Sequence, residues 1–219
     1  MTDLPLILAS SSPRRRELLA LLDVPFEVRV SDFDEDSIPF NVESPGDWAC
    51  ALAKAKAEAV AQHINPACVI IGADTTVVVD RENLGKPTDK QDALRMLKSL
   101  SGRTHEVYTG ICVFHKSGHG AEATCKLLFN VSHVTFDSVP DRVLIEYIES
   151  GEPMDKAGSY GIQGEALSFI PKVEGDYYNV VGLPLAAVRT LLLPHYPNVA
   201  PAPAQPDFPD PTRYVRVCA

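Results

Sequence analysis

The chain has 219 residues, of which 45% are hydrophobic and 22% are charged, and its 20 basic and 29 acidic side chains give a net charge of −9 at pH 7. These two fractions are typical of globular proteins, which excludes a disordered chain and a fibrous repeat. The acidic balance opposes general binding to nucleic-acid backbones and anionic membranes, so we expect neither as a partner. The sequence shows no apolar run near the ~20 residues that cross a bilayer, and no basic and apolar leader. We therefore predict a cytoplasmic protein.

Apolar spacing and turn residues predict the secondary structure in chain order. The predicted elements are a strand over 4–9, a helix opened by Ser12 and Pro13 and running to about 22, a strand over 26–30, a helix over 47–63, strands over 68–71 and 75–79, a helix that starts at 88–91 and closes at Gly102, a hairpin of strands over 105–115 and 121–136, a helix over 141–149 and a helix over 184–193. Gly72-Ala73-Asp74 joins two of these strands, so Asp74 is expected at a strand junction. The stretch 151–182 is rich in glycine and turn residues and is predicted to be a loop that carries polar side chains.

The segment Ser10-Ser11-Ser12-Pro13-Arg14-Arg15-Arg16 stands at the start of a predicted helix. Unpaired N–H groups, hydroxyls and guanidiniums converge there, which favours a bound phosphate. A capped helix with a solvated basic face is the alternative that the residues alone leave open.

Acidic and basic side chains elsewhere could complete a polyphosphate site. Asp34 and Glu35 lie in an acidic loop and Asp74 follows an apolar strand, and such hard oxygen ligands suit a Mg²⁺ ion that is shared with a polyphosphate. Lys56 and Lys86 are isolated point charges suited to phosphate oxygens. The alternatives are an exposed acidic loop, a turn aspartate and two surface lysines, which spacing alone does not exclude.

Six ordered motifs between about residues 4 and 193 resemble the Maf family of nucleoside triphosphate pyrophosphatases. They are L-I-L-A-S-S-S-P-R-R-R-E-L-L, I-I-G-A-D-T-T-V, L-G-K-P, L-S-G-R-T-H-E-V-Y-T-G, Y-I-E-S-G-E-P-M-D-K-A-G-S-Y-G-I-Q-G and N-V-V-G-L-P-L. The resemblance implies an α/β fold like that of inosine triphosphate pyrophosphatases, with a long twisted mixed sheet, flanking helices and two lobes around a cleft. It also implies hydrolysis of a nucleoside triphosphate to the monophosphate and pyrophosphate with Mg²⁺ or Mn²⁺, a homodimer, and a link to septum formation.

The resemblance also assigns roles by position. It implies that Asp74 is the catalytic aspartate that activates water, assisted by Glu35, Lys56 and Lys86, and we expect Asp74 and Glu35 to hold the metal. The phosphate-binding residues are implied to be Ser10, Arg14 and Arg15.

Three positions separate the branches of this family. The branch that acts on dTTP and UTP has the residues seen here at Arg14, Thr75 and Gln163, whereas the 7-methyl-GTP branch typically has tryptophan, another residue and glutamate. A neutral amide such as Gln163 can donate and accept toward the imide edge of uracil or thymine, which an ionised glutamate cannot. Glu165-Ala166 stands where many members have a second glycine, which is expected to stiffen or reshape that loop.

The expected domain organisation is a Maf-like domain over 1–194 and a proline-rich extension over 195–219. Seven of the 18 residues from 194 to 211 are proline, which predicts an extended polyproline II tail lying against the body or a partner. Two rival functions stay open. One is a regulator of cell division that binds the nucleotide without hydrolysing it, and the other is an interaction protein that docks through the tail.

Overall fold

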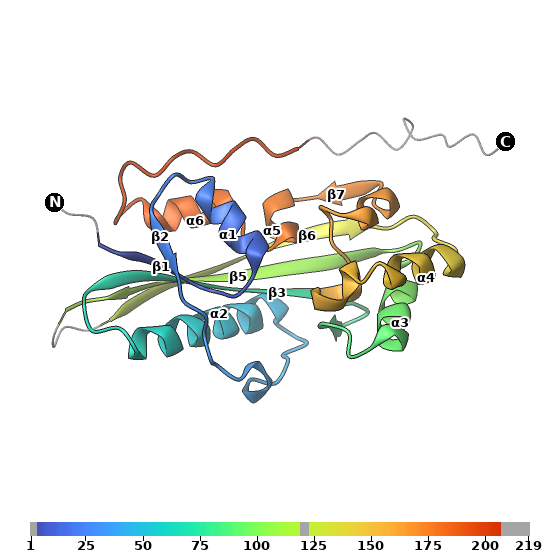
Figure 1. Ribbon diagram of the computed structural model, residues 1–219, viewed down its shortest axis with the longest axis horizontal. Helices are drawn as coiled ribbons and strands as arrows, with labels where there is room; N and C mark the ends of the chain where they lie inside the picture. Colours follow the sequence, from blue (N-terminus) through green and yellow to red (C-terminus); the bar gives the residue numbers. More distant parts are fainter. Residues whose placement is uncertain (1–3, 119–122, 207–219) are drawn as a thin grey trace.

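The computed structural model describes residues 4–118 and 123–206, in which one mixed sheet forms the centre of the molecule (Figure 1). Along the sheet the strand order is β2-β1-β3-β5-β6-β7, and β4 pairs with β3 off this path. β1 runs parallel to β2 and β3, and the other pairs are antiparallel. The strands are β1 (Leu6–Ala9), β2 (Phe26–Val28), β3 (Cys68–Val79), β4 (Glu82–Leu84), β5 (Thr104–Lys116), β6 (Thr124–Thr135) and β7 (Lys172–Glu174). The predicted α/β class with a long mixed sheet is confirmed.

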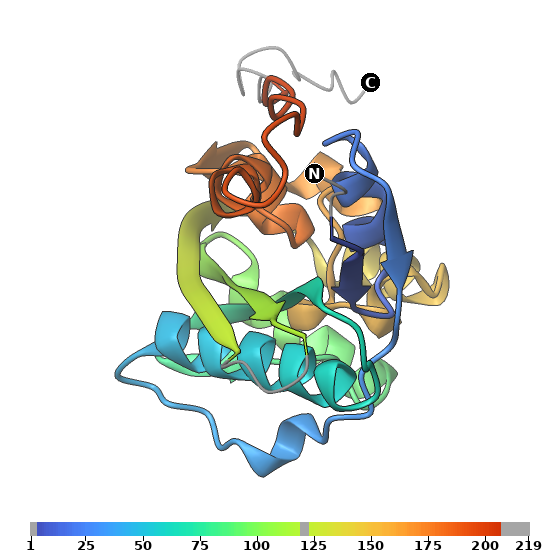
Figure 2. The same ribbon diagram turned by 90° about the vertical axis from the view of Figure 1, so that its left-hand side faces the viewer.

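Helices cover both faces of this sheet. They are α1 (Pro13–Ala20), α2 (Pro45–Gln62), α3 (Lys90–Leu100), α4 (Asp141–Glu149), α5 (Tyr177–Val181) and α6 (Leu185–Leu192). α2 lies along one face, and α1, α5 and α6 lie on the other (Figure 2). α3 and α4 pack together at the end of the long strands that lies away from α6 (Figure 1). No helix within the described ranges is long and apolar enough to cross a membrane.

Two glycines let α2 approach the sheet unusually closely. A Cβ atom on Gly72 of β3 would lie 1.9 Å from the Ala53 carbonyl oxygen, and one on Gly110 of β5 would lie 2.3 Å from the Ala49 carbonyl carbon. Only glycine leaves room for backbone at such distances. The alanine-rich sequence of α2 completes this contact, because Ala49, Ala53 and Ala57 are fully buried. The two glycines therefore set the distance between α2 and the sheet, and with it the positions of the other side chains on α2.

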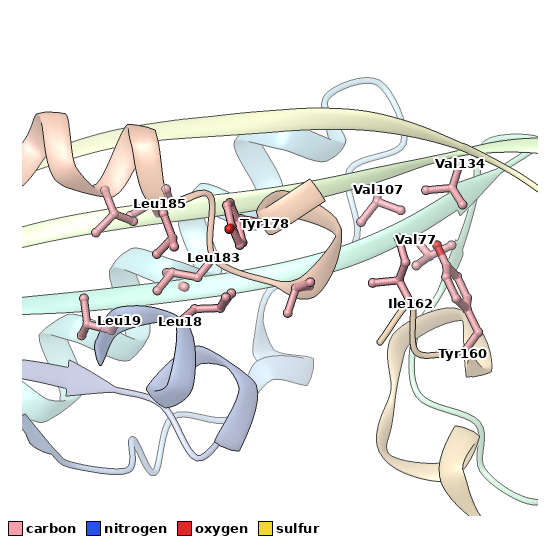
Figure 3. Close-up of a cluster of buried hydrophobic side chains, with 14 of the residues drawn as sticks. Leu18, Leu19, Val77, Val107, Val134, Tyr160, Ile162, Tyr178, Leu183 and Leu185 are labelled. Atoms are coloured by element: carbon pink, nitrogen blue, oxygen red, sulfur yellow. The ribbon is translucent and has the colours of Figure 1, made fainter. Parts of the chain in front are cut away.

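The opposite face is filled by larger side chains (Figure 3). Leu18 and Leu19 of α1 lie beside Leu183 and Tyr178, toward one end of the cluster. At the other end Tyr160 faces the long strands. These residues belong to one continuous core, so apolar contacts with the sheet hold α1 and α5 in place.

The structure corrects the prediction at Asp74. β3 is one continuous strand from Cys68 to Val79, so Asp74 lies in the middle of a strand rather than at a junction. The prediction was wrong because Gly72 and Ala73 interrupt the apolar run. Gly72 makes room for α2, and Ala73 packs in the core on the opposite face of the sheet. Within 151–182 the structure also has β7 and the short helix α5, which the sequence did not predict.

The beginning of the proline-rich tail is packed on the body. Residues 195–206 form no helix or strand, but Tyr196 and Val199 are buried in the core. The Tyr196 hydroxyl donates to the Leu4 carbonyl oxygen at 2.8 Å, and the Ala200 N–H donates to the Leu22 carbonyl oxygen at 2.9 Å. Residues 207–219 of the predicted tail and 121–122 of the predicted 121–136 strand lie outside the described residues.

Candidate active site

A cavity of about 960 Å³ opens beside the middle of β3 and is walled by segments from most of the chain. Nine residues predicted from the sequence line it: Ser10, Arg14, Arg15, Glu35, Lys56, Asp74, Thr75, Lys86 and Gln163. Asp34, the other acid of the predicted cluster, is not among the lining residues, because its carboxylate caps the 3₁₀ turn at Glu35 by accepting from the Asp36 N–H at 3.2 Å. The structure thus brings together side chains that are up to about 150 positions apart in the sequence.

The cavity lies at a gap along the edge of β3. β1 pairs with this strand over 69–72 and β4 pairs with it over 77–79, both on the edge away from β5. Residues 73–76 have no strand neighbour on that edge among the described residues. Because successive side chains of a strand face opposite sides, Asp74 and Thr75 reach the gap from the two faces of the sheet.

On the α2 face the gap holds an ammonium between two carboxylates. Asp74 points to the same face as Gly72, toward α2, and its Oδ1 accepts a hydrogen bond from Lys56 Nζ at 2.5 Å. The same Nζ lies 2.9 Å from Oε1 of Glu35, which begins a short 3₁₀ turn over Glu35–Ser37. Lys56 and Asp74 are only 8% and 7% exposed. Buried charges of this kind are stable only when they are paired.

Burial and charge separate the proton affinities of these two carboxylates. Burial raises the pKa of Asp74 above its ordinary value, although Lys56 and Arg15 act in the opposite direction. For Glu35 burial is outweighed by the hydrogen bond and charge of Lys56, with help from Lys86 and Arg15, so its pKa is lowered. Two neighbouring acids with pKa values moved in opposite directions are suited to different roles, one staying ionised and the other accepting a proton.

On the other face the start of α1 presents an arginine. Ser12 caps the helix, with its Oγ accepting from the Arg15 N–H at 3.4 Å. The Arg15 guanidinium donates to the Gly182 carbonyl oxygen at 2.9 Å, to Thr75 Oγ1 at 3.0 Å and to Ser10 Oγ at 3.4 Å. Burial lowers the pKa of Arg15, which Asp74 and Glu35 counteract. Arginine nevertheless stays protonated in proteins, so it supplies a fixed cation to the cavity.

Two threonine hydroxyl groups on the sheet hold the Arg15 guanidinium in place through successive hydrogen bonds. Thr109 Oγ1 donates to the Asn179 carbonyl oxygen at 2.9 Å, and Thr75 Oγ1 lies 2.9 Å from Thr109 Oγ1. Since the Thr109 proton is used on that carbonyl, Thr75 donates to Thr109 and accepts from Arg15. The threonine that follows Asp74 therefore orients the arginine.

The remaining predicted residues lie around the mouth. Arg14 is 3.6 Å from Asp155. Lys86 follows β4 and is near enough for its charge to lower the pKa of Glu35. Gln163 lines the cavity together with its loop neighbours Gly161 and Gly164. Burial raises the pKa of Tyr177, and the nearby Gln163 side chain acts the other way.

Further polar residues line the cavity that sequence reasoning did not assign to it. Glu152, Asp155 and Lys156 are among its walls, and Lys156 Nζ lies 2.7 Å from Asp155 Oδ1. The sequence could have indicated these three residues, because they lie in one of the motifs that resemble the Maf family and in a loop predicted to carry polar side chains. Glu165 and Ala166 begin a 3₁₀ turn over Glu165–Phe169, and the Glu165 N–H donates to Glu152 Oε2 at 3.1 Å.

The acid–lysine cluster fits a metal that takes only part of its ligands from protein. In the described part of the chain there is no group of three or more His, Cys, Asp or Glu side chains that could hold an ion. Asp74 and Glu35 nevertheless converge on one Lys56 ammonium in a cavity that also contains arginines. Mg²⁺ is commonly bound by one or two carboxylates together with substrate phosphates and water. Two acids therefore suffice for a cation that arrives with a polyphosphate.

Fold and cavity together define an α/β protein with an arginine-bearing helix start and an acid–lysine cluster at a gap in one sheet edge. Comparison with known proteins then places the chain. Residues 5–194 match the family described as Maf-like protein, so the chain belongs to the Maf family, as its motifs predicted.

Curated relatives cover most of the chain. A dTTP/UTP pyrophosphatase of Bacillus mycoides (strain KBAB4) is 48% identical over 182 residues, which are 83% of this chain and 90% of the relative. A dTTP/UTP pyrophosphatase of Clostridium tetani (strain Massachusetts / E88) is 46% identical over 187 residues, 85% of this chain and 95% of the relative. Among solved structures, a nucleoside-triphosphatase / dITP/XTP pyrophosphatase from Mycobacterium abscessus is 15% identical with a TM-score of 0.36, covering 62% of this chain and 76% of that chain. That last likeness is too loose to support an argument.

Proposed function

We propose that this protein hydrolyses dTTP, UTP and related pyrimidine nucleoside triphosphates to the monophosphate and pyrophosphate, with Mg²⁺ or Mn²⁺. The observation that carries the proposal is the buried Lys56 between Asp74 and Glu35 in a cavity that also holds the arginine loop. The names of the relatives support the substrate class, since both relatives described above are dTTP/UTP pyrophosphatases. Such an enzyme would remove surplus or non-standard nucleotides from the pool.

In this proposal the cations bind and neutralise the triphosphate. Ser10, Arg14 and Arg15 at the start of α1 contact phosphate oxygens, and the helix N-terminus adds its own N–H groups. Lys56 and Lys86 offset the negative charge that develops on the leaving pyrophosphate. Fixed charges in a cavity are effective because they need no reorganisation during the reaction.

Asp74 is the proposed proton acceptor. Water attacks the α-phosphorus, its proton passes to the Asp74 carboxylate, and the bond from that phosphorus to the oxygen bridging to the β-phosphorus breaks, releasing pyrophosphate. Burial raises the pKa of Asp74, which makes this carboxylate a stronger base than an exposed one. Glu35 and Asp74 are the residues that would hold the divalent ion, which polarises phosphoryl oxygens when it is bound.

The proposed preference for uracil and thymine rests on Arg14, Thr75 and Gln163. Thr75 holds Arg15 in place, as its hydrogen bond indicates. The amide of Gln163 is proposed to pair with the imide edge of the base, accepting from N3–H and donating to a carbonyl. A glutamate there would repel that carbonyl, as expected for an enzyme of the 7-methyl-GTP type.

Pyrophosphate release from dTTP and UTP tests the function directly. Asp74→Asn should lower turnover by about 10²-fold or more, since general bases contribute on the order of 10²–10⁴. Asp141→Asn is the matched control, because Asp141 is an exposed aspartate on α4 that pairs with Lys98. Nucleotide that binds up to one equivalent per protein without release of pyrophosphate would instead indicate a nucleotide-binding regulator, and preferential turnover of 7-methyl-GTP would move the enzyme to the other branch. Assays with Mg²⁺ and Mn²⁺ establish the metal.

We also propose a homodimer that forms through the exposed face of β6. Leu127, Phe129 and Val131 are 44%, 44% and 38% exposed and alternate along this strand, and β7 pairs with β6 only over 133–135. An apolar stripe beside an open strand edge is a favourable surface for a second chain. Leu127→Glu together with Val131→Glu should give a monomer in sedimentation, whereas a chain that is already monomeric would refute the proposal.

The domain boundaries and location are proposed as the sequence predicts them. We propose a catalytic domain over 1–194, an extension over 195–219 and a cytoplasmic location. Since Tyr196 and Val199 are buried in the core, the first residues of the extension are proposed to fold with the domain.

A further inference from the structure

Gln163 lies in a tight turn over residues 161–164. The Gly164 N–H donates to the Gly161 carbonyl oxygen at 3.1 Å, so Ile162 and Gln163 are the two central residues of this turn. Ile162 is 3% exposed and belongs to the core (Figure 3), whereas Gln163 is exposed and lines the cavity. One central residue therefore anchors the turn, and the next one depends on how firmly the turn is held.

The carboxylate of Glu152 holds the backbone on both sides of Gln163. Its Oε2 accepts directly from the Glu165 N–H at 3.1 Å. Its Oε1 accepts from the Tyr147 hydroxyl at 3.0 Å, and that hydroxyl oxygen in turn accepts from the Gly161 N–H at 3.2 Å. The two bonded N–H groups stand two positions before and two positions after Gln163, so one carboxylate reaches both ends of the turn.

The chemistry of these groups fixes the direction of each hydrogen bond. The backbone N–H groups of Gly161 and Glu165 can only donate, and a carboxylate can only accept. The Tyr147 hydroxyl accepts from Gly161, so it directs its own proton to Glu152. Burial raises the pKa of Tyr147 and the charge of Glu152 adds to this effect, so the phenol keeps that proton. The bridge from Glu152 to Gly161 therefore has a single arrangement.

Gly164 leaves the room that the Glu152 carboxylate occupies. A Cβ atom on Gly164 would lie 2.1 Å from Glu152 Oε1, and its φ of −109° is outside the left-handed region, so space rather than backbone conformation requires glycine here. The backbone of Glu152 is itself fixed. Its N–H donates to Ser150 Oγ at 3.2 Å, and its carbonyl oxygen accepts from Lys156 Nζ. The carboxylate is therefore held directly against the turn.

We infer that Glu152 is a positioning residue for base recognition, which together with Tyr147 fixes the turn that carries Gln163 and so places its side chain against the uracil or thymine base. Both Glu152 oxygens accept from groups of this loop and of α4, whereas Asp74 and Glu35 contact the Lys56 ammonium. The inference rests on the proposed function, because Gln163 contacts the base in that reaction.

The test compares dTTP with inorganic triphosphate, which has the phosphates without a base, in full-length variants. Glu152→Ala should raise KM for dTTP about 2- to 10-fold, the range expected for one hydrogen bond. Its kcat should stay close to the wild-type value, because a base contact serves substrate and transition state alike. The inhibition constant of inorganic triphosphate should also stay unchanged, since the phosphate-binding residues keep their contacts. Glu152→Gln keeps one acceptor oxygen, so its KM should fall between those of the wild type and Glu152→Ala.

Two further variants disturb the same contacts and leave Glu152 in place. Tyr147→Phe removes only the bridging hydroxyl. Gly164→Ala puts a methyl group where the carboxylate lies, and the fold should be kept because the end of a flexible side chain can move aside. Both should raise KM for dTTP and leave the inhibition constant of inorganic triphosphate unchanged. They carry the test if Glu152→Ala does not fold, which thermal unfolding of each variant shows.

A double variant tests whether Glu152 acts through Gln163. In the Gln163→Ala protein the base contact is already absent, so adding Glu152→Ala should raise KM for dTTP no further. Glu149→Ala is the matched control, because Glu149 is an exposed glutamate three positions earlier that pairs with Lys90. Gly118→Ala is the control for Gly164→Ala, since its Cβ would meet nothing within 4 Å.

The outcomes separate this inference from the proposed function. Wild-type protein that releases no pyrophosphate from dTTP or UTP refutes the function, and the inference with it. An active wild type whose Glu152 and Gly164 variants keep the KM of their controls refutes the inference alone. The same holds if the inhibition constant of inorganic triphosphate rises as much as KM, which would place the effect on the phosphates, or if kcat falls at unchanged KM, which would place Glu152 among the reacting groups. A full additional rise of KM in the double variant would likewise show that Glu152 does not act through Gln163.

Discussion

Replacing Gly72 by alanine should damage both stability and turnover, because this glycine sets the distance between α2 and β3. The added Cβ would lie 1.9 Å from the Ala53 carbonyl oxygen, whereas ordinary contact begins at 3.4 Å. The helix and strand must therefore separate by about 1.5 Å, since neither backbone atom can move without its element in a close-packed interior. Overpacking of this kind typically costs about 1–3 kcal/mol.

The same separation should disturb the acid–lysine cluster. Lys56 follows Ala53 by one helical turn, so a displaced α2 carries Nζ away from Asp74, whose Oδ1 it now contacts at 2.5 Å. A displacement of about 1 Å at a catalytic group can cost on the order of 10²-fold in rate. We therefore expect Gly72→Ala to lower kcat about 10²-fold and the melting temperature by about 2–12 °C, given about 2–4 °C per kcal/mol for a chain of this size.

Calorimetry and pyrophosphate release measure these two effects. Gly118→Ala is the matched control, because a Cβ there would meet nothing within 4 Å. Gly110→Ala should behave like Gly72→Ala, since its Cβ would lie 2.3 Å from the Ala49 carbonyl carbon of the same helix. A Gly72→Ala protein with the melting temperature and turnover of the control would show that close approach of α2 does not position Lys56.

Three further predictions concern buried ionisable groups. Lys56→Met leaves Asp74 and Glu35 without their shared ammonium and should lower the free energy of unfolding by about 3 kcal/mol in urea titrations; unchanged stability would contradict a buried ion pair. Because burial raises the pKa of Asp74 and the base must be ionised, kcat/KM should fall with decreasing pH through a pKa above 3.8, and a pH–rate profile that stays flat to below pH 3.8 would argue against it. Burial lowers the pKa of His105 to about 3, so the unfolded chain takes up a proton near pH 6.5 and the folded protein does not. Unfolding free energy should drop by about 2 kcal/mol between pH 7 and pH 5, and His105→Asn should flatten this slope.

The local parts of the site could be predicted from sequence because their chemistry is local. Ser12 caps α1 and Pro13 opens it, as the order of residues indicates. The basic residues that follow are then necessarily at a helix N-terminus, where an anion is favourable. The bounds of α2 were predicted within about two residues for the same reason, since its alanines and lysines favour helix and Ser44-Pro45-Gly46 marks its start.

Contacts between distant segments were beyond sequence reasoning without the family resemblance. Nothing in the spacing of Lys56 and Asp74 shows that they touch, because that contact depends on Gly72 admitting a helix backbone. In the same way α5 was missed because a five-residue helix owes its form to its surroundings, among them the acceptor oxygen of Gln205. Tertiary contacts override weak local preference in such short segments.

The continuity of β3 explains why an aspartate and a threonine occupy adjacent positions. In one unbroken strand Asp74 faces α2 and Lys56, and Thr75 faces α1 and Arg15. Both reach the cavity only because the strand edge is unpaired between its contacts with β1 and β4. A slip of one residue in this register would turn the carboxylate toward the arginine face and the hydroxyl toward Lys56, leaving a buried ammonium without its acid. The pairing of Gly72 with Ala9 and of Val77 with Leu84, on either side of the gap, fixes the register of β3. This register therefore determines both the fold and which face of the sheet the Asp74 carboxylate reaches.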